Sequence, residues 1–150
     1  MSVHEATATW KGDLTSGTGE VSTKSGAVRT ARVDWDERTE GTGAADRTSP
    51  EELLAAAHAS CFSMALAARL AKNGTAARKI DVVARVTFGA VGAGKGVVSS
   101  ELIVAADSDA DAATLQELAE DAKDKCPISQ ALKGNVALSV SVAERIPAGR

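Results

Sequence analysis

The segment SPEELLAAAHASCFSMALAARLAKNG, residues 49–74, decides the fold of this chain. Ser49 is a favourable N-cap residue, Pro50 suits the first helical position, and Glu52 stands three residues after Ser49 as in a capping box. The pair Asn73-Gly74 is a helix stop signal. We therefore predict a helix from residue 50 to residue 72. Because this helix is apolar on nearly all sides, we expect it to lie buried in the interior of the protein.

The same segment contains the longest apolar stretch of the chain, residues 53–71, so a membrane span is the alternative interpretation. Four polar residues interrupt the stretch: His58, Ser60, Ser63 and Arg69. Alanine supplies much of its apolar content. A bilayer span needs about 20 predominantly apolar residues. The sequence therefore favours a core helix and no membrane association.

Alternating polar and apolar residues on both sides of this helix predict β-strands. We expect strands at residues 6–10, around Val21, and at 27–35, 80–88, 98–104 and 136–142. Residues 36–47 and 89–96 are polar or glycine-rich and are expected to form a loop and a turn. Asp111 opens a second helix to about Lys125, and Cys126-Pro127 opens a third that ends near Gly134. This order predicts an α+β fold with antiparallel sheets.

Length, charge and composition limit the function classes. The chain has 150 residues, 17 Lys and Arg against 20 Asp and Glu, and a formal net charge of −3, which fits a single domain spanning residues 1–150. An acidic chain with 3% aromatic residues and no Tyr lacks the basic face of a nucleic-acid-binding protein. Residues 1–13 are polar and form no apolar signal segment, so we expect a cytoplasmic protein.

The two cysteines, Cys61 and Cys126, are the residues with the most reactive chemistry. A thiolate needs a positive neighbour or a helix N-terminus to form at neutral pH. Cys61 is in the middle of the predicted helix, so a cation would have to come from elsewhere. Cys126 precedes Pro127 at a helix start, where free N–H groups stabilise negative charge, which favours a resolving or leaving-group role. The alternative is that both thiols are small core residues.

Several motifs carry a resemblance to a known family. Residues 49–66, SPEELLAAAHASCFSMAL, resemble the central helix of the OsmC/Ohr family of thiol peroxidases, and residues 126–133, CPISQALK, resemble its second-cysteine motif. Residues 10–13, WKGD, residues 19–23, GEVST, and the pair Ser25-Gly26 resemble the OsmC branch. The resemblance implies an OsmC-like fold, with antiparallel sheets around a long central helix, in an intertwined homodimer.

The resemblance also implies a reaction and a set of site residues. The peroxidatic cysteine falls on Cys61, the resolving cysteine on Cys126, a loop arginine on Arg38 and a glutamate on Glu51. By this resemblance, the four residues would reduce organic hydroperoxides without a metal or prosthetic cofactor. An external dithiol, by family resemblance a dihydrolipoyl group, would return the two cysteines to free thiols. The arginine would stabilise the thiolate and the developing charge on oxygen, and the glutamate would orient it through a charge-assisted pair.

The loop departs from the family pattern at Thr39, where an aromatic residue is frequent, so other arginines compete with Arg38: Arg29, Arg32 and Arg47.

Ten residues along a helix span about 15 Å, too far for Glu51 to touch Cys61 directly. Either Arg38 bridges part of that distance, or Glu51 belongs to the site that contains the Cys61 of a second chain. The predicted all-apolar helix also needs more covering than one small sheet supplies, so we expect a homodimer.

The sequence allows three other interpretations of the cysteines and their neighbours. His58 is one helical turn before Cys61 and would serve as the base of a cysteine acyl-transfer enzyme. His58 and Cys61, together with Cys126 and His4, would form a zinc site, although the spacing of a structural zinc motif is absent. A small domain without enzymatic activity is the third alternative. Five large side chains are candidates to line an apolar substrate pocket or to fill the core: Trp10, Trp35, Phe62, Met64 and Phe88.

Overall fold

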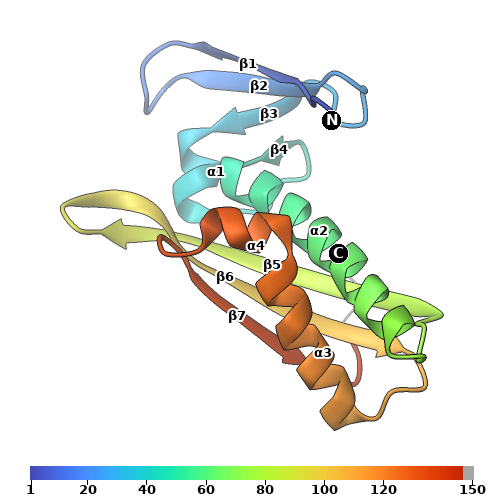
Figure 1. Cartoon of the computed structure of the whole chain (residues 1–150). Coiled ribbons are helices and arrows are strands. Elements are labelled where there is room, and N and C mark those ends of the chain that lie inside the picture. The colour runs from blue at the N-terminus through green and yellow to red at the C-terminus, as the bar shows by residue number, and fades with distance from the viewer. Residues whose placement is uncertain (147–150) are drawn as a thin grey trace. The chain divides into compact units, whose positions relative to one another are not determined.

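The computed structural model describes residues 1–146, which fold as two compact units, Met1–Leu53 and a second unit that begins at Leu54. Both contain strands and helices, as predicted for an α+β chain (Figure 1). The elements follow one another as β1 (Ala6–Lys11), β2 (Thr18–Thr23), β3 (Ala31–Asp34), α1 (Trp35–Glu40), β4 (Arg47–Thr48), α2 (Pro50–Lys72), β5 (Lys79–Val91), β6 (Gly94–Asp107), α3 (Ala112–Lys125), α4 (Pro127–Leu132) and β7 (Ala137–Val142).

The first unit is a four-stranded sheet in the order β1-β2-β3-β4, with α1 between β3 and β4. The predicted strand at 27–35 is shorter than expected, and the predicted loop at 36–47 contains α1. The reason is local: the Asp34 carboxylate accepts the backbone N–H of Glu37 at 2.9 Å and caps a helix at this point.

The strand β1 is present where the alternating pattern predicts it, but all six of its residues are exposed. Alternation of polar and apolar residues is typical of a strand with one buried face, but in a single chain neither face of β1 is buried. Trp10 is 43% exposed and Leu14 is 58% exposed, so the apolar side chains of this hairpin have no core to join within one copy of the chain.

The second unit contains a three-stranded sheet in the order β5-β6-β7. The strands β5 and β6 form a long antiparallel hairpin that turns at Gly92, which has φ of +56°. The predicted turn at 89–96 is thus mostly strand, because the ladder continues almost to its tip. The pairs β1·β2, β2·β3 and β5·β6 are antiparallel, as predicted, whereas the pairs β3·β4 and β6·β7 are parallel. In both cases helical residues separate the two strands in sequence and let the chain return in the same direction.

The helix α2 has the predicted bounds, Pro50–Lys72. At its start, the Ser49 hydroxyl accepts the N–H of Glu52 at 3.0 Å, while the Glu52 carboxylate accepts the Thr48 hydroxyl at 2.5 Å. Only half of the predicted capping box is therefore formed. At its end, Gly74 has φ of +79° and the next N–H bonds back to the Leu70 carbonyl, which completes a left-handed helix stop.

The core of the second unit lies between its helices and the sheet. α2 and α3 lie on one face of the sheet (Figure 1), and their buried side chains meet those of the central and last strands. The members of this core are Phe62, Leu66 and Leu70 of α2, Leu102 and Val104 of β6, Leu115, Ala119 and Ala122 of α3, Cys126, and Val140 of β7.

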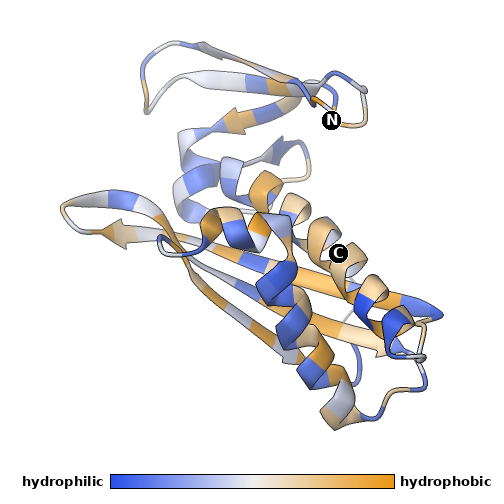
Figure 2. Ribbon diagram, in the orientation of Figure 1, coloured by the Kyte–Doolittle hydropathy of each residue, from blue (hydrophilic) through white to orange (hydrophobic). Residues whose placement is uncertain are grey.

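Only one face of α2 is buried in the chain. The helix is apolar along most of its length (Figure 2), and by length and composition it is long enough to cross a membrane. Its buried face, however, packs in the core described above and carries the polar side chain of His58. On the opposite face Met64 is 67% exposed. The helix is therefore a core helix on one side and an uncovered apolar surface on the other.

Candidate active site

The two predicted cysteines lie together in the second unit. Cys61 is in the middle of α2 and is partly buried, and Cys126 is fully buried at the N-cap of α4. Both are free thiols, and Cys126 lies close enough to Cys61 to affect the pKa of its thiol. The backbone N–H of Ile128, in the first turn of α4, also donates to the Cys61 sulfur. Two residues that are far apart in the sequence thus form one dithiol site.

The surroundings of Cys61 raise the pKa of its thiol. Burial is the largest cause, because it disfavours the charged thiolate, and the neighbouring Cys126 adds to the increase. The hydrogen bond from the Ile128 N–H acts in the opposite direction and lowers the pKa. These groups leave Cys61 protonated at neutral pH, so efficient nucleophilic chemistry requires a cation in addition.

In the first unit, Arg38 of α1 forms an ion pair with Glu51 of α2. Its Nη2 lies 3.0 Å from Oε1 of Glu51, and its Nε lies 3.2 Å from Oε1 and 3.3 Å from Oε2. The Glu51 side chain is 8% exposed and that of Arg38 is 35% exposed. A forked guanidinium–carboxylate pair of this kind fixes the plane and direction of the guanidinium.

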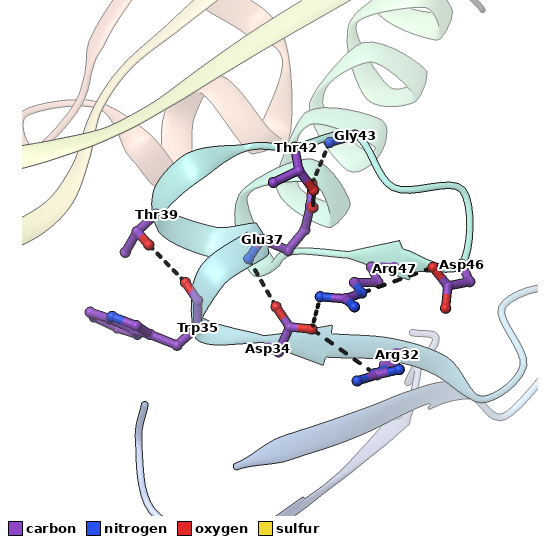
Figure 3. A network of polar contacts seen from close by, with 9 residues as sticks. All are labelled: Arg32, Asp34, Trp35, Glu37, Thr39, Thr42, Gly43, Asp46 and Arg47. Atoms are coloured by element: carbon purple, nitrogen blue, oxygen red, sulfur yellow. Dashed lines mark hydrogen bonds and ion pairs between the residues drawn. The ribbon is translucent and has the colours of Figure 1, made fainter. Parts of the chain in front are cut away.

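Arg47, the competitor of Arg38, pairs with another carboxylate. Its Nη1 lies 2.9 Å from the Asp34 carboxylate, which also has the Arg32 Nε at 4.0 Å, and its Nε lies 3.9 Å from Asp46 (Figure 3). The Asp34 carboxylate thus joins β3, β4 and the start of α1. Arg47 takes part in holding the helix that carries Arg38, whereas Glu51 binds Arg38.

Glu37 holds the segment after α1 and is a residue that the sequence interpretation missed. Its carboxylate is largely buried and accepts the Thr42 hydroxyl and, at 3.0 Å, the N–H of Gly43 (Figure 3). The Thr42 hydrogen bond is the largest cause of its lowered pKa. The spacing of Asp34 and Glu37 is that of an N-cap and the third helical residue, and this spacing was the signal that identifies α1.

A cavity of about 280 Å³ lies in the first unit beside Arg38. Its lining is mainly apolar and consists of Trp10, Leu14, Val33, Asp34, Trp35, Arg38 and Pro50. Of the five side chains predicted to line a pocket or fill the core, the two tryptophans line this cavity. Phe62 belongs to the core of the second unit, and Met64 is exposed.

His58 does not act on Cys61 in this structure. Its Nδ1 is hydrogen-bonded to the Ser100 hydroxyl at 2.7 Å and its Nε2 to the Ser129 hydroxyl at 2.8 Å. Because both ring nitrogens have serine partners, the acyl-transfer interpretation lacks its base. Within residues 1–146, no three His, Cys, Asp or Glu side chains are grouped in a way that would hold a metal ion.

Comparisons with known proteins agree with the motifs. The family model described as OsmC-like protein matches residues 41–141. The chain is 39% identical over 143 residues to peroxiredoxin OsmC of Escherichia coli strain K12, covering 92% of this chain and 96% of that protein. It is 34% identical over 104 residues to the organic hydroperoxide resistance protein of Xanthomonas axonopodis pv. citri strain 306, covering 69% of this chain and 72% of that protein.

The fold agrees as well. The crystal structure of an organic hydroperoxide resistance protein from Elizabethkingia anophelis matches with a TM-score of 0.72 at 26% identity, covering 96% of this chain and 99% of that one. A family model that matches most of the chain, a relative of high identity and a shared fold lead to one conclusion. The chain belongs to the family of OsmC-like proteins.

Proposed function

We propose that this protein is a thiol peroxidase that reduces organic hydroperoxides, with Cys61 as the peroxidatic and Cys126 as the resolving cysteine. The observation that carries the proposal is the proximity of the two thiols, Cys61 on α2 and Cys126 at the start of α4. Relatives named peroxiredoxin and organic hydroperoxide resistance protein support the same activity. In this proposal the protein acts in defence against oxidative and osmotic stress, as a soluble cytoplasmic enzyme.

The reaction proceeds in three steps. The Cys61 thiolate attacks the distal oxygen of the hydroperoxide, the O–O bond breaks, and the alkoxide leaves and takes up a proton, so that Cys61 becomes a sulfenic acid and the product is an alcohol. The Cys126 sulfur then attacks the Cys61 sulfur, water leaves, and a disulfide forms. An external dithiol, a dihydrolipoyl group in this proposal, reduces the disulfide by thiol–disulfide exchange.

Arg38 supplies the cation that the dithiol site needs. Burial raises the pKa of Cys61, so a guanidinium beside the sulfur is required to favour the thiolate at neutral pH. The same group stabilises the charge that develops on the leaving oxygen. The buried carboxylate of Glu51 holds Arg38 in one orientation through the forked pair. In this account Arg38 is catalytic, and Glu51 positions it.

The enzyme is a homodimer in this proposal. The exposed face of α2 carries Ala56, Ala57, Met64, Ala67, Ala68 and Ala71, and β1 is exposed along its whole length. A second copy of the chain would cover both apolar surfaces, which favours association by the hydrophobic effect. We expect light scattering of the purified protein to give twice the mass of one chain. A fully active monomer would contradict this part of the proposal.

The cavity beside Arg38 receives the organic part of the substrate. Replacing Trp35 by Ala removes an aromatic wall, so we expect kcat/KM for cumene hydroperoxide to fall about 10-fold, since a lost apolar contact of this size costs about 1–3 kcal/mol. Hydrogen peroxide has no organic group, so its kcat/KM is expected to remain within about twofold of wild type. An equal loss for both peroxides would show that Trp35 only supports the fold.

The test of the proposed function is hydroperoxide turnover by the purified protein. We expect consumption of cumene hydroperoxide with dihydrolipoamide as the reductant, and a lower rate with hydrogen peroxide. A protein that is folded and dimeric but consumes neither peroxide with any dithiol would overturn the proposal.

A further inference from the structure

His58 is a buried polar side chain to which the proposed reaction assigns no role. It is fully buried on α2, one helical turn before Cys61, and burial lowers its pKa, so the ring is neutral at pH 7. A neutral imidazole has one N–H donor and one acceptor nitrogen, and a serine hydroxyl can act as either. The two hydrogen bonds with Ser100 and Ser129 therefore satisfy the ring completely.

The two serines belong to different elements. Ser100 lies on the central strand β6, and Ser129 lies on the short helix α4. Ser129 is the only residue of α4 that is buried, at 2% exposure. A six-residue helix has little intrinsic stability, so its position depends on its tertiary contacts. The bond between Ser129 and His58 ties this helix directly to α2.

The start of α4 is also the part of the chain that contacts Cys61. Cys126 is its N-cap and a neighbour of Cys61, and the Ile128 N–H is directed at the Cys61 sulfur. His58 and Cys61 are one turn apart on α2, and Ser129 and Cys126 are one turn apart at the beginning of α4. The two helices thus meet at two neighbouring places, at the hydrogen bond between the Ser129 hydroxyl and the His58 ring and where the start of α4 approaches Cys61.

We propose that the hydrogen bond between Ser129 and His58 positions the start of α4 so that Cys126 can attack the oxidised Cys61. The inference rests on the proposed two-cysteine cycle and adds the residues that set the rate of its second step. In that step the Cys126 sulfur forms a bond to the Cys61 sulfur, the S–O bond of the sulfenic acid breaks, and the oxygen leaves as water with the Cys126 proton. Such an attack requires the two sulfurs to be held close and aligned.

The second step is the appropriate readout for this role. A loosened α4 would remove the Ile128 hydrogen bond, which raises the pKa of Cys61, and would also expose the thiol to water, which lowers it. These effects on the first step oppose each other. Moving Cys126 away would also remove its contribution to the raised pKa of Cys61. The formation of the disulfide, in contrast, depends directly on the distance between the two sulfurs.

The experiment compares Ser129→Ala with Ser100→Ala in single turnover. Both serines are buried, and each substitution leaves one His58 nitrogen without a partner, so thermal unfolding should show a similar loss of stability.

After mixing with one equivalent of cumene hydroperoxide, dimedone traps the sulfenic acid, and mass spectrometry of quenched samples gives the rate of disulfide formation. We expect Ser129→Ala to slow disulfide formation about 10-fold and to accumulate the dimedone adduct, as the loss of a buried hydrogen bond implies. Ser100→Ala is expected to form the disulfide at the wild-type rate.

A second pair of variants separates the two bonds of the ring itself. The side-chain amide of Gln reaches the place of Nε2 and can keep the bond to Ser129, whereas that of Asn reaches the place of Nδ1 and can keep the bond to Ser100. We expect His58→Gln to retain fast disulfide formation and His58→Asn to lose it. Equal rates for the two serine variants and for the two histidine variants would overturn the inference while wild type still forms its disulfide. If wild type forms a sulfenic acid but no disulfide, the two-cysteine cycle itself is wrong.

Discussion

Replacing Cys61 by Ser is expected to abolish hydroperoxide turnover, with a loss of at least about 1,000-fold in kcat/KM. The reason is the nucleophile: a serine hydroxyl stays protonated at neutral pH and attacks a peroxide oxygen far more slowly than a thiolate. The measurement is the steady-state consumption of cumene hydroperoxide with dihydrolipoamide. Thermal unfolding serves as the control for folding, because Cys61 is only partly buried and the serine is nearly isosteric.

Cys126→Ser is the matched variant, because it removes the other thiol of the same site. It should consume one equivalent of hydroperoxide at a rate near that of wild type and then stop as a sulfenic acid that dimedone traps. The two variants therefore separate the two roles. If Cys126→Ser lost the first oxidation and Cys61→Ser kept it, the peroxidatic and resolving roles would have to be exchanged.

Replacing Arg38 by Met is expected to lower kcat/KM about 100-fold, the typical loss when one preorganised donor to developing charge is removed. Without the guanidinium, burial keeps the pKa of Cys61 raised, and the thiolate forms only at higher pH. The remaining activity of Arg38→Met should therefore increase with pH over a range in which wild type is already constant. The measurement is the pH profile of kcat/KM for both proteins.

Arg47→Met is the control for this prediction, since it removes the same charge from the same unit. Arg47 pairs with Asp34 and Asp46, so its loss should reduce the stability of the α1 segment and leave the shape of the pH profile unchanged. Glu51→Gln keeps a hydrogen-bond acceptor for Arg38 but removes the charge, and it should have a smaller effect than Arg38→Met. If Arg47→Met shifted the profile and Arg38→Met did not, the catalytic arginine would be Arg47.

The helices could be predicted from the sequence because their signals are local. Ser49 and Gly74 mark the two ends of α2, and the Asp111 carboxylate accepts the N–H of Thr114 at the start of α3, where the sequence predicts a helix. Capping residues act within one turn of chain, so they can be identified without knowledge of the tertiary structure. The helix α1 was missed because its N-cap, Asp34, lies at the end of a predicted strand.

The arrangement of the strands and the surroundings of the site depend on contacts between distant residues. Nothing within β6 or β7 indicates that they pair in parallel, since that direction follows from the path through α3 and α4. The two serine partners of His58 are 42 and 71 residues away from it in sequence. For this reason the sequence suggested His58 as a base for Cys61, whereas in the folded chain both ring nitrogens are hydrogen-bonded to serines, Ser100 and Ser129.

In the proposed cycle, Cys61 and Cys126 form a disulfide after one reaction with an organic hydroperoxide. The most direct measurement is mass spectrometry of the non-reduced wild-type protein, intact and after proteolysis, before and after one equivalent of cumene hydroperoxide. We expect each chain to lose the mass of two hydrogen atoms and the peptides containing Cys61 and Cys126 to be joined. Dihydrolipoamide should separate these peptides again. Two free thiols after the treatment, in a folded protein, would show that Cys61 and Cys126 are not a peroxidatic and a resolving cysteine.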